Sequence, residues 1–465
     1  MKKSGGFLTS KYYLEFVLFG LLLALLAMGC ESKVQKSEKP TNEVSYRIWP
    51  SEPPPDCPFQ KSQTITGVAF TNRHAEYGHA DTWYPSWAPN GAMYSPFTDG
   101  TVGAVRSMSV GPKATTGFAE IIGDDPMHLV VKPLGVVAAS PEPYGGRYPC
   151  GTLVYNGVWY YGTYVLDDLN GSCGNWCVLG PFVGFRISKD YGKTWIRTKL
   201  TPVHNHFGES AKKGEKVKIG SPHFVDFGKN MEHSPDGKAY LVAHGATRPN
   251  AHNSWISGDQ IYLLRVTPSP ENINDVTKYE FFAGYDPNGT PKWSKRFSDI
   301  RPLFVWNDHA GCVTMTYDAP LRKYLMCVTH GWPTIGKFDT YILESDRMTG
   351  PWRLVTYMRN FGEQGYFVNI PSKFISTDGR TAWLCYAANF TNGYLKTHYG
   401  SVPMGGRYGM CLHEIKMLRG DTRSLPAINA AVLFSGKDFV LNSSRETLVA
   451  GRSFSLHSGN QHRRR

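Results

Sequence analysis

The stretch CGTLVYNGVWYYGTYV, residues 150–165, holds two runs of β-favouring residues separated by the pair Asn156-Gly157. Asn-Gly is a strong hairpin signal because both central residues of the tight turn must adopt positive φ. Four other stretches share this organisation of apolar run, polar turn and second, aromatic-rich run: TWYPSWAPNGAMYSPF (82–97), KNMEHSPDGKAYLVAHG (229–245), GCVTMTYDAPLRKYLMCVTHG (311–331) and VNIPSKFISTDGRTAWLCYAAN (368–389). The sequence therefore predicts five β-hairpins.

The spacing of the five turns indicates how the hairpins are assembled. Their centres recur every 60 to 80 residues, roughly the scale of a four-stranded propeller blade with long loops. We therefore predict an all-β chain folded as a five-bladed β-propeller. The runs TITGVAFT from Thr64 and AAVLFSG from Ala430 lie outside the repeats, and one of them is expected to close the terminal blade.

A second pair of motifs fits the outer strands of blades. Residues 188–195 read SKDYGKTW and residues 345–352 read SDRMTGPW, each between two strand-like runs. The first resembles the sialidase-type Asp-box, S-x-D-x-G-x-T-W. The second resembles the hairpin S-x-x-x-T-G-P-W of five-bladed glycosidases such as glycoside hydrolase family 43. In such hairpins the Trp packs between neighbouring blades, and the motif is a folding device without catalytic meaning.

The N-terminal residues predict export and anchoring. Residues 1–29 combine three lysines with the apolar run Phe16–Met28 and end before Cys30, the pattern of a lipoprotein signal peptide. Residues 30–62 form a polar tether, 63–420 the catalytic propeller and 421–465 a closure segment with a basic tail. We expect a bacterial cell-envelope protein whose lipid anchor at Cys30 binds a membrane. A retained signal anchor is the alternative, although the apolar run is short for a membrane span.

Replacing the acylated cysteine tests this expectation. Cys30→Ser should abolish labelling by a fatty-acid analogue and leave the precursor unprocessed, because only a thiol accepts the lipid in this pathway. Metabolic labelling and the mass of the mature chain measure both effects. Normal processing and membrane retention of Cys30→Ser would point to another route of export.

The net charge indicates which classes of molecule the protein could bind, and the cysteine count raises the question of disulfide bonds. The formal net charge is +12, partly from the tail QHRRR and the signal region. No basic stripe interleaves with a nucleic-acid motif, so we expect no nucleic acid, and a basic exported surface suits acidic polysaccharides. A monomer is expected. Eight cysteines remain besides Cys30; the bonds Cys312–Cys327 and Cys385–Cys411 are one hypothesis, and free buried thiols are the other.

Catalytic residues of a propeller are expected where the inner strands begin, because these positions from all blades converge on one central funnel. Aligning the hairpins brings together Asp81, Tyr148, residues 229–232, Asp308-His309 and Asn369. In family 43 and its relatives a carboxylate at the mouth of the first blade acts as base or nucleophile. The resemblance thus implies this role for Asp81, with Asp99 as the second candidate, although the sequence Thr-Asp-Gly is also ordinary turn chemistry.

The resemblance also implies a general acid on the third blade, a position that matches Glu232 by blade order and not by a shared motif. We expect further polar and aromatic side chains to bind the sugar, each with a structural role as the alternative. They are His79, Tyr84, His223, His244, Arg301, Asp308, His309, Trp332, Tyr366 and Asn369.

No cofactor is expected, but one hairpin carries metal-ligand types. The spacing of His309, Cys312, Cys327 and His330 resembles a Cys2His2 zinc site. Residues three apart in a strand point to opposite faces, so such a site needs a bulge.

Three functions remain open. The leading hypothesis is a glycoside hydrolase that acts on a polysaccharide or oligosaccharide through paired carboxylates. The first alternative is a lyase acting on a uronate-containing, ulvan-like glycan through His223, His244, Tyr285 and Arg301. Lyases of this type have seven blades, however, and the sequence has five hairpins. The second alternative is a glycan-binding lipoprotein without catalysis, which would keep aromatic residues but lack a carboxylate pair.

Overall fold

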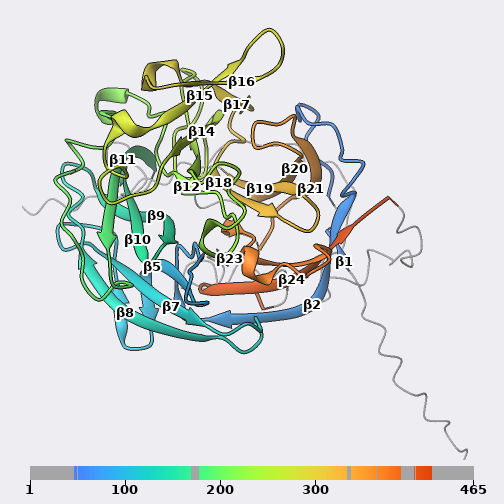
Figure 1. Cartoon of the computed structure of the whole chain (residues 1–465), viewed down its shortest axis with the longest axis horizontal. Coiled ribbons are helices and arrows are strands. Elements are labelled where there is room, and N and C mark those ends of the chain that lie inside the picture. The colour runs from blue at the N-terminus through green and yellow to red at the C-terminus, as the bar shows by residue number, and fades with distance from the viewer. Residues whose placement is uncertain are drawn as a thin grey trace, which may run out of the picture. The chain divides into compact units, whose positions relative to one another are not determined.

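Five β-sheets stand around one axis, as Figure 1 shows, and each sheet is a propeller blade. The computed structural model describes residues 47–49, 51–168, 177–331, 337–362, 364–388, 403 and 405–420. Within these ranges nearly every regular element is a strand. The all-β class and the five-bladed architecture predicted from the hairpin spacing are confirmed.

The first two blades come from residues 79–196. Blade 1 contains β3 (His79–Asp81), β4 (Ser86–Trp87), β5 (Met93–Val102), β6 (Val105–Ser107), β7 (Thr115–Ile122) and β8 (Val130–Ala138). Blade 2 contains β9 (Gly146–Tyr155), β10 (Val158–Asp167) and β11 (Val178–Ser188). Asn156 and Gly157 join β9 to β10 with φ of 49° and 78°, the positive values that the hairpin signal requires.

Three further blades complete the ring. Blade 3 contains β12 (His223–Phe224), β13 (Ala239–Gly245), β14 (Gln260–Val266), β15 (Glu280–Tyr285), β16 (Pro291–Ser294) and β17 (Pro302–Val305). Blade 4 contains β18 (Cys312–Asp318), β19 (Lys323–His330), β20 (Asp339–Ser345) and β21 (Arg353–Met358). Blade 5 contains β22 (Gly365–Asn369), β23 (Thr381–Ala388), β24 (Met410–Leu418), β2 (Gly67–Tyr77) and β1 (Arg47–Ile48).

Five short 3-10 turns lie in the connections of the described residues: η1 (Lys212–Gly214), η2 (Lys229–Met231), η3 (Val276–Lys278), η4 (Phe297–Asp299) and η5 (Ser372–Phe374). No helix of the described part of the chain is both long and apolar enough to cross a membrane.

An N-terminal strand closes the ring. β2 pairs antiparallel with β24, from Gly67 opposite Leu418 to Tyr77 opposite Met410. Blade 5 therefore combines strands from both ends of the described chain: β1 and β2 come from its start, and β22, β23 and β24 from its end. The run TITGVAFT is the closing element that the sequence analysis left open, whereas AAVLFSG lies outside the described residues.

The inner strands run in the same direction along the axis, which gives the ring two distinct ends. Asp226 after β12 forms a parallel bridge with Thr316 of β18. The amide of Asn369 in β22 donates to the carbonyl of Trp83 between β3 and β4, at 2.9 Å. We call the end where the inner strands begin the mouth, and the end where they finish the far end.

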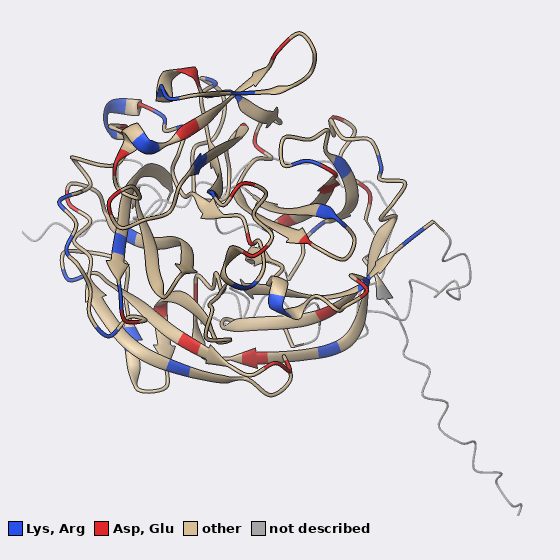
Figure 2. Cartoon of the chain, in the orientation of Figure 1, with Lys and Arg blue, Asp and Glu red and all other residues tan. Residues whose placement is uncertain are grey.

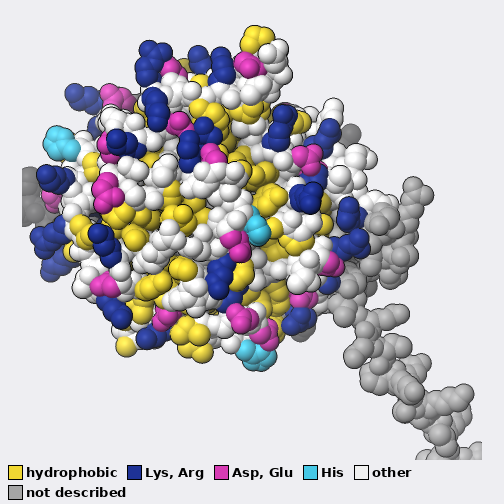
Figure 3. Space-filling model, in the orientation of Figure 1, with side chains coloured by type: hydrophobic (Ala, Val, Ile, Leu, Met, Phe, Trp, Pro, Cys, Tyr) yellow, Lys and Arg dark blue, Asp and Glu magenta, His cyan; other side chains and the backbone are white. Residues whose placement is uncertain are grey.

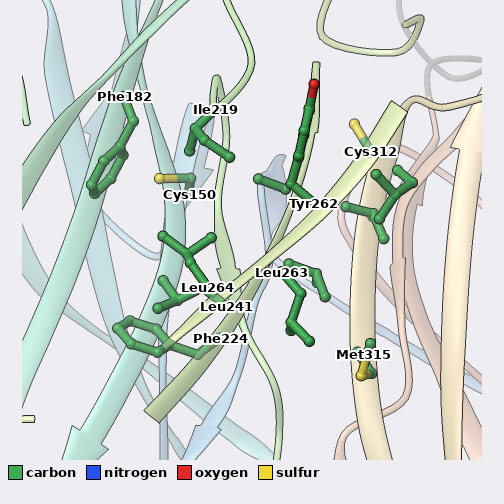
Figure 4. Packing of buried hydrophobic residues seen from close by; sticks show 14 of the residues in the cluster. Cys150, Phe182, Ile219, Phe224, Leu241, Tyr262, Leu263, Leu264, Cys312 and Met315 are labelled. Atoms are coloured by element: carbon green, nitrogen blue, oxygen red, sulfur yellow. The ribbon is translucent and has the colours of Figure 1, made fainter. Parts of the chain in front are cut away.

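The core lies between the blades and is rich in aromatic and aliphatic side chains. Figure 4 shows Leu241 and Leu264 of blade 3 beside Phe224, with Phe182 on the same side, whereas Leu263 lies on the opposite side of the strand, towards Met315. Figure 2 shows Lys and Arg interspersed with Asp and Glu around all five blades. Charge is therefore spread over the propeller without a single-sign stripe in this view.

The first outer hairpin motif, SKDYGKTW, places its Trp side chain between two blades. The Ser188 hydroxyl donates to Asp190 Oδ1 at 2.7 Å, and the Thr194 hydroxyl donates to Asp190 Oδ2 at 2.6 Å. These bonds fix the turn so that Trp195 contacts Phe118 of blade 1 and Trp159 of blade 2, with ring centroids 5.1 and 5.3 Å apart. The Trp side chain lies between neighbouring blades.

The two predicted disulfide bonds are wrong. In the β18–β19 ladder Cys312 faces Thr329 and Cys327 faces Thr314, so the two thiols are not partners. Cys385 of β23 faces Leu412, while Cys411 faces Tyr386. All four are free thiols, as are Cys57 and Cys150. Cys312 and Cys327 share a face of the ladder but stand two register positions apart. Cys385 and Cys411 occupy adjacent register positions, whose side chains point to opposite faces of the sheet.

Candidate active site at the mouth of the propeller

Asp81 and Asp99 meet at the mouth of blade 1. Asp81 is the last residue of β3 and stands opposite Thr98 of β5 in the ladder, so Asp99 is its diagonal neighbour. Gly100, beside them, has no room for a Cβ, which would clash with the carbonyl oxygen of His79. Close approach of these two backbones is what brings the carboxyl groups together.

Hydroxyl groups converge on Asp81. The Thr82 hydroxyl donates to Oδ1 at 2.8 Å and the Tyr366 hydroxyl, from β22, donates to Oδ2 at 3.0 Å. Tyr408 also hydrogen-bonds this carboxyl group. Burial nevertheless raises the pKa of Asp81 well above the ordinary value, and the nearby charge of Asp99 raises it further. The three hydroxyl donors only partly oppose that rise.

Asp99 is held in an unusual backbone conformation. Its φ is 51°, a left-handed value that costs a non-glycine residue free energy and that Asp tolerates better than most. The backbone N–H of Ser109 donates to Oδ1 at 2.6 Å, and the Tyr408 hydroxyl donates to the Asp99 carbonyl at 2.7 Å. Burial raises the pKa of Asp99, though less than that of Asp81, and the Ser109 donors oppose the rise. As whole residues, Asp81 and Asp99 are partly exposed.

Aromatic side chains from other blades surround the carboxyl pair. The Trp255 ring lies 5.2 Å from that of Tyr366, and the exposed His79 ring lies 5.3 Å from that of Tyr408. Tyr148 at the start of β9 is buried, and the charges of Asp99 and Asp81 add to the burial that raises its pKa. Blades 1, 2, 3 and 5 thus contribute to one polar and aromatic site.

A narrow polar cavity runs along the axis below this site. It has a volume of about 40 Å³, enough for roughly three waters, and is lined by residues such as Tyr84, His223 and Asn369. The rings of Tyr84 and His223 lie 3.9 Å apart. Burial lowers the pKa of His223 to about 3, and that of His244 to about 4, so both imidazoles are neutral near pH 7. These residues form the buried support of the mouth.

Glu232 does not join Asp81, contrary to the expected pairing. It follows η2, and its side chain is half exposed. Asp226, at the start of the same connection, accepts from Ser372, whereas Asp81 accepts from Tyr366. Tyr366 lies near the start of the inner strand β22, whereas Ser372 follows its end. The Asn230 side chain also donates to Asn156, in the turn after the inner strand β9. Glu232 therefore lies at the far end and Asp81 at the mouth.

The four residues of the zinc alternative do not form one site. Cys312 donates to the Trp255 carbonyl and belongs to a different core cluster from Cys327. The rings of His309 and His330 lie 4.4 Å apart, but His330 Nε2 contacts the Tyr357 hydroxyl and His309 Nδ1 contacts the Asn307 carbonyl. No metal-ligand cluster occurs among the residues that the structure describes.

The set expected for a lyase is also dispersed. His223 is on β12, the first strand of blade 3, whereas Tyr285 ends β15, the fourth. Three strand spacings separate them by about 14 Å. Arg301 is exposed and lies beside Gly284 near Tyr285, while His244 is buried with Nε2 on the Ser254 carbonyl at 3.0 Å.

The remaining expected residues have separate positions. Asp308 lies in the loop before β18, where Oδ1 is 3.0 Å from His252 Nδ1. Asn369 is buried and donates to backbone carbonyls. Trp332 and Cys30 lie outside the described residues. The sequence analysis missed Tyr408, which precedes β24 without a turn motif to mark it, and the hydroxyl donor Thr82.

Comparisons with known proteins concern the fold. No protein-family model matches the sequence, and no curated protein matches it. Among solved structures, a GH43_1 enzyme from Xanthomonas citri has 16% identity and a TM-score of 0.40, covering 73% of this chain and 89% of its own. Zg3597, a family 117 glycoside hydrolase from Zobellia galactanivorans, has 12% identity and a TM-score of 0.41, covering 77% and 93%. The solved structures similar to this chain thus include five-bladed propeller glycoside hydrolases.

Proposed function

We propose that the protein is a glycoside hydrolase whose acid–base pair is Asp81 and Asp99. The observation that carries the proposal is the pair itself: two carboxyl groups at the mouth, on partly exposed residues, whose pKa values are both raised. Cleavage of a glycosidic bond needs one carboxyl group that gives a proton and one that accepts a proton or attacks the sugar. A pair with separated pKa values meets both needs.

Because the two carboxyl groups interact, the proton that they hold near neutral pH belongs to the pair. We propose that Asp81, whose pKa burial and the charge of Asp99 both raise, carries this proton and protonates the leaving oxygen. Asp99, ionised earlier, activates water or attacks the anomeric carbon. This assignment reverses the role that the family resemblance implies for Asp81. Activity should then be highest near neutral pH, falling in acid as Asp99 is protonated and in alkali as Asp81 loses its proton.

The surroundings support a sugar substrate. Tyr366 and Trp255 pack beneath the carboxyl pair, and the partly exposed Tyr408 offers a ring and a hydroxyl group beside it, a combination suited to contact with a sugar ring. We further propose that the enzyme acts in the cell envelope, held by the lipid on Cys30 that the sequence predicts.

Digestion of a glycan panel tests the reaction class. Hydrolysis adds one water to the products, which mass spectrometry detects, and produces new reducing ends. Elimination would instead leave an unsaturated uronate with ultraviolet absorbance. Unchanged glycans across neutral and acidic members of the panel would contradict the hydrolase proposal.

Removing one hydroxyl tests the tuning of the pair. Tyr366→Phe deletes a donor that lowers the pKa of Asp81, so that pKa should rise and the alkaline limb of the kcat/KM profile should move to higher pH. We expect about a tenfold loss of kcat/KM at neutral pH. The control is Tyr386→Phe, a buried tyrosine of β23. An unchanged limb in Tyr366→Phe would separate Tyr366 from the catalytic pair.

A further inference from the structure

A second cavity lies on blade 4, behind the hairpin SDRMTGPW. Its volume is about 480 Å³, within the range of small-molecule sites. Lys323 of β19, Arg347 of the hairpin and Arg353 of β21 contribute cations to its wall, and Glu344 and Asp346 contribute carboxylates. The residues come from three strands and the N-terminal segment, so the cavity is built by the fold and not by one loop.

Both carboxylates of this cavity pair with the same lysine. Lys323 Nζ lies 2.9 Å from Glu344 Oε2 and 2.7 Å from Asp346 Oδ1. The hydroxyls of Ser62 and Thr64 donate to the other oxygen of Glu344, each at 2.7 Å. Glu344 is only 2% exposed, so this arrangement is a fixed part of the wall.

Two guanidinium groups in the wall remain unpaired with carboxylates among the described residues. Arg347 Nε donates to the Gly350 carbonyl at 3.2 Å, and Arg353 NH1 donates to Gln60 Oε1 at 3.1 Å. Each guanidinium carries five N–H donors, so these bonds hold the planes and leave donors unused. A planar fork of unused donors matches an oxyanion better than a neutral hydroxyl group.

We propose that this cavity binds an oxyanion, a carboxylate or sulfate group, through Arg347 and Arg353. The hairpin would then hold a ligand in addition to its part in packing. The oxyanion is either a substituent of an acidic glycan or a free inorganic ion. Figure 3 shows Lys and Arg interspersed with Asp and Glu on the face in view, so the proposed attraction for an oxyanion is local to the two guanidinium groups. The proposal does not rest on the catalytic role of Asp81.

Calorimetric titration of the whole protein tests the site with three probes: inorganic sulfate, trigalacturonate and neutral xylotriose. The protein carries Asp81→Asn, so that no probe is cleaved and the outcome is independent of the proposed reaction. We expect saturable binding of sulfate or trigalacturonate and at least about a tenfold loss of affinity in Arg347→Gln/Arg353→Gln. If trigalacturonate binds about tenfold more tightly than sulfate, the oxyanion belongs to an acidic glycan. If it binds equally or more weakly, the ligand is a free inorganic ion.

The first hairpin motif supplies the matched control. The double variant Lys193→Gln/Arg197→Gln also removes two positive charges, one within the motif SKDYGKTW of blade 2 and one just after it. It should leave the affinity for the oxyanion unchanged. If the double variant of blade 4 fails to fold, Arg347→Gln alone is measured, because that side chain is exposed. Unchanged affinity in the blade 4 variant, an equal loss in the blade 2 control, or equal binding of xylotriose would overturn the proposal.

Discussion

Asp81→Asn should lose roughly 10²–10⁴-fold in kcat, the usual contribution of a positioned acid or base. The amide keeps the shape of the carboxyl group but cannot donate the catalytic proton. The matched control is Glu232→Gln, at the far end of the propeller, which should retain wild-type activity. Steady-state kinetics on the glycan identified by the panel measure both. Equal loss in Glu232→Gln would show that the far end takes part in the reaction.

The same variant should be more stable than the wild type above neutral pH. Because the pKa of Asp81 is raised in the folded protein, the folded state binds the proton more tightly than the unfolded chain does. Wild-type stability therefore falls as pH rises from about 4, the ordinary Asp pKa, towards the raised value. The amide of the variant carries no such charge, so the gain should be absent in acid and should reach several kcal/mol in alkali, about 1.4 kcal/mol for each unit by which the pKa of Asp81 is raised. Denaturant unfolding across pH measures it, and a loss of stability in alkali would contradict the burial argument.

The leaving group separates the two catalytic roles. If Asp81 is the proton donor, Asp81→Asn should retain activity on a dinitrophenyl glycoside, whose leaving group needs no proton. Asp99→Asn should be slow on every substrate, and added azide should restore part of its rate by replacing the lost carboxylate. If Asp99→Asn retains activity on the dinitrophenyl glycoside and azide rescues Asp81→Asn instead, Asp81 is the base or nucleophile.

The largest expected loss of stability is that of Trp159→Ala. Trp159 is fully buried between blades 1 and 2, with ring centroids 5.2 Å from Tyr94 and 5.3 Å from Trp195. Truncating such a side chain leaves a cavity that neighbouring sheets cannot fill, and costs about 3–5 kcal/mol. The denaturation midpoint should fall accordingly. Tyr285→Ala is the control, since that side chain is 42% exposed and should cost much less. Similar midpoints for the two variants would mean that the interface repacks.

Local turn chemistry was enough to predict the blades but not all of the site. The Asn156-Gly157 turn, and the position of Asp81 directly before the first hairpin, depend on neighbouring residues, so both could be predicted from the sequence. Blade 3 departs from the pattern because its inner strand β12 is only two residues long and ends before η2. Positive φ at Asn230 and Met231 turns the chain there. The alignment of the hairpins does not reveal this turn, so it predicted the wrong end of the propeller for Glu232.

The other site residues meet only through the ring. Tyr408 reaches Asp99, and Tyr366 reaches Asp81, across sequence separations of about 300 residues. No periodicity or turn signal records such contacts, because they depend on how many blades complete the circle. The disulfide hypotheses failed for a related reason: proximity in a hairpin was predictable, but the facing of each thiol depended on register.

Closure of blade 5 by β2 has a consequence for how the protein is made. The pairing partners Gly67 and Leu418 are about 350 residues apart, so nearly the whole chain must be present before they meet. The entropy of closing so long a loop is recovered only when the final contact forms, which makes the last step slow and cooperative. A chain still being synthesised is therefore an open row of blades. The circle becomes locked only after both its first and last strands are present.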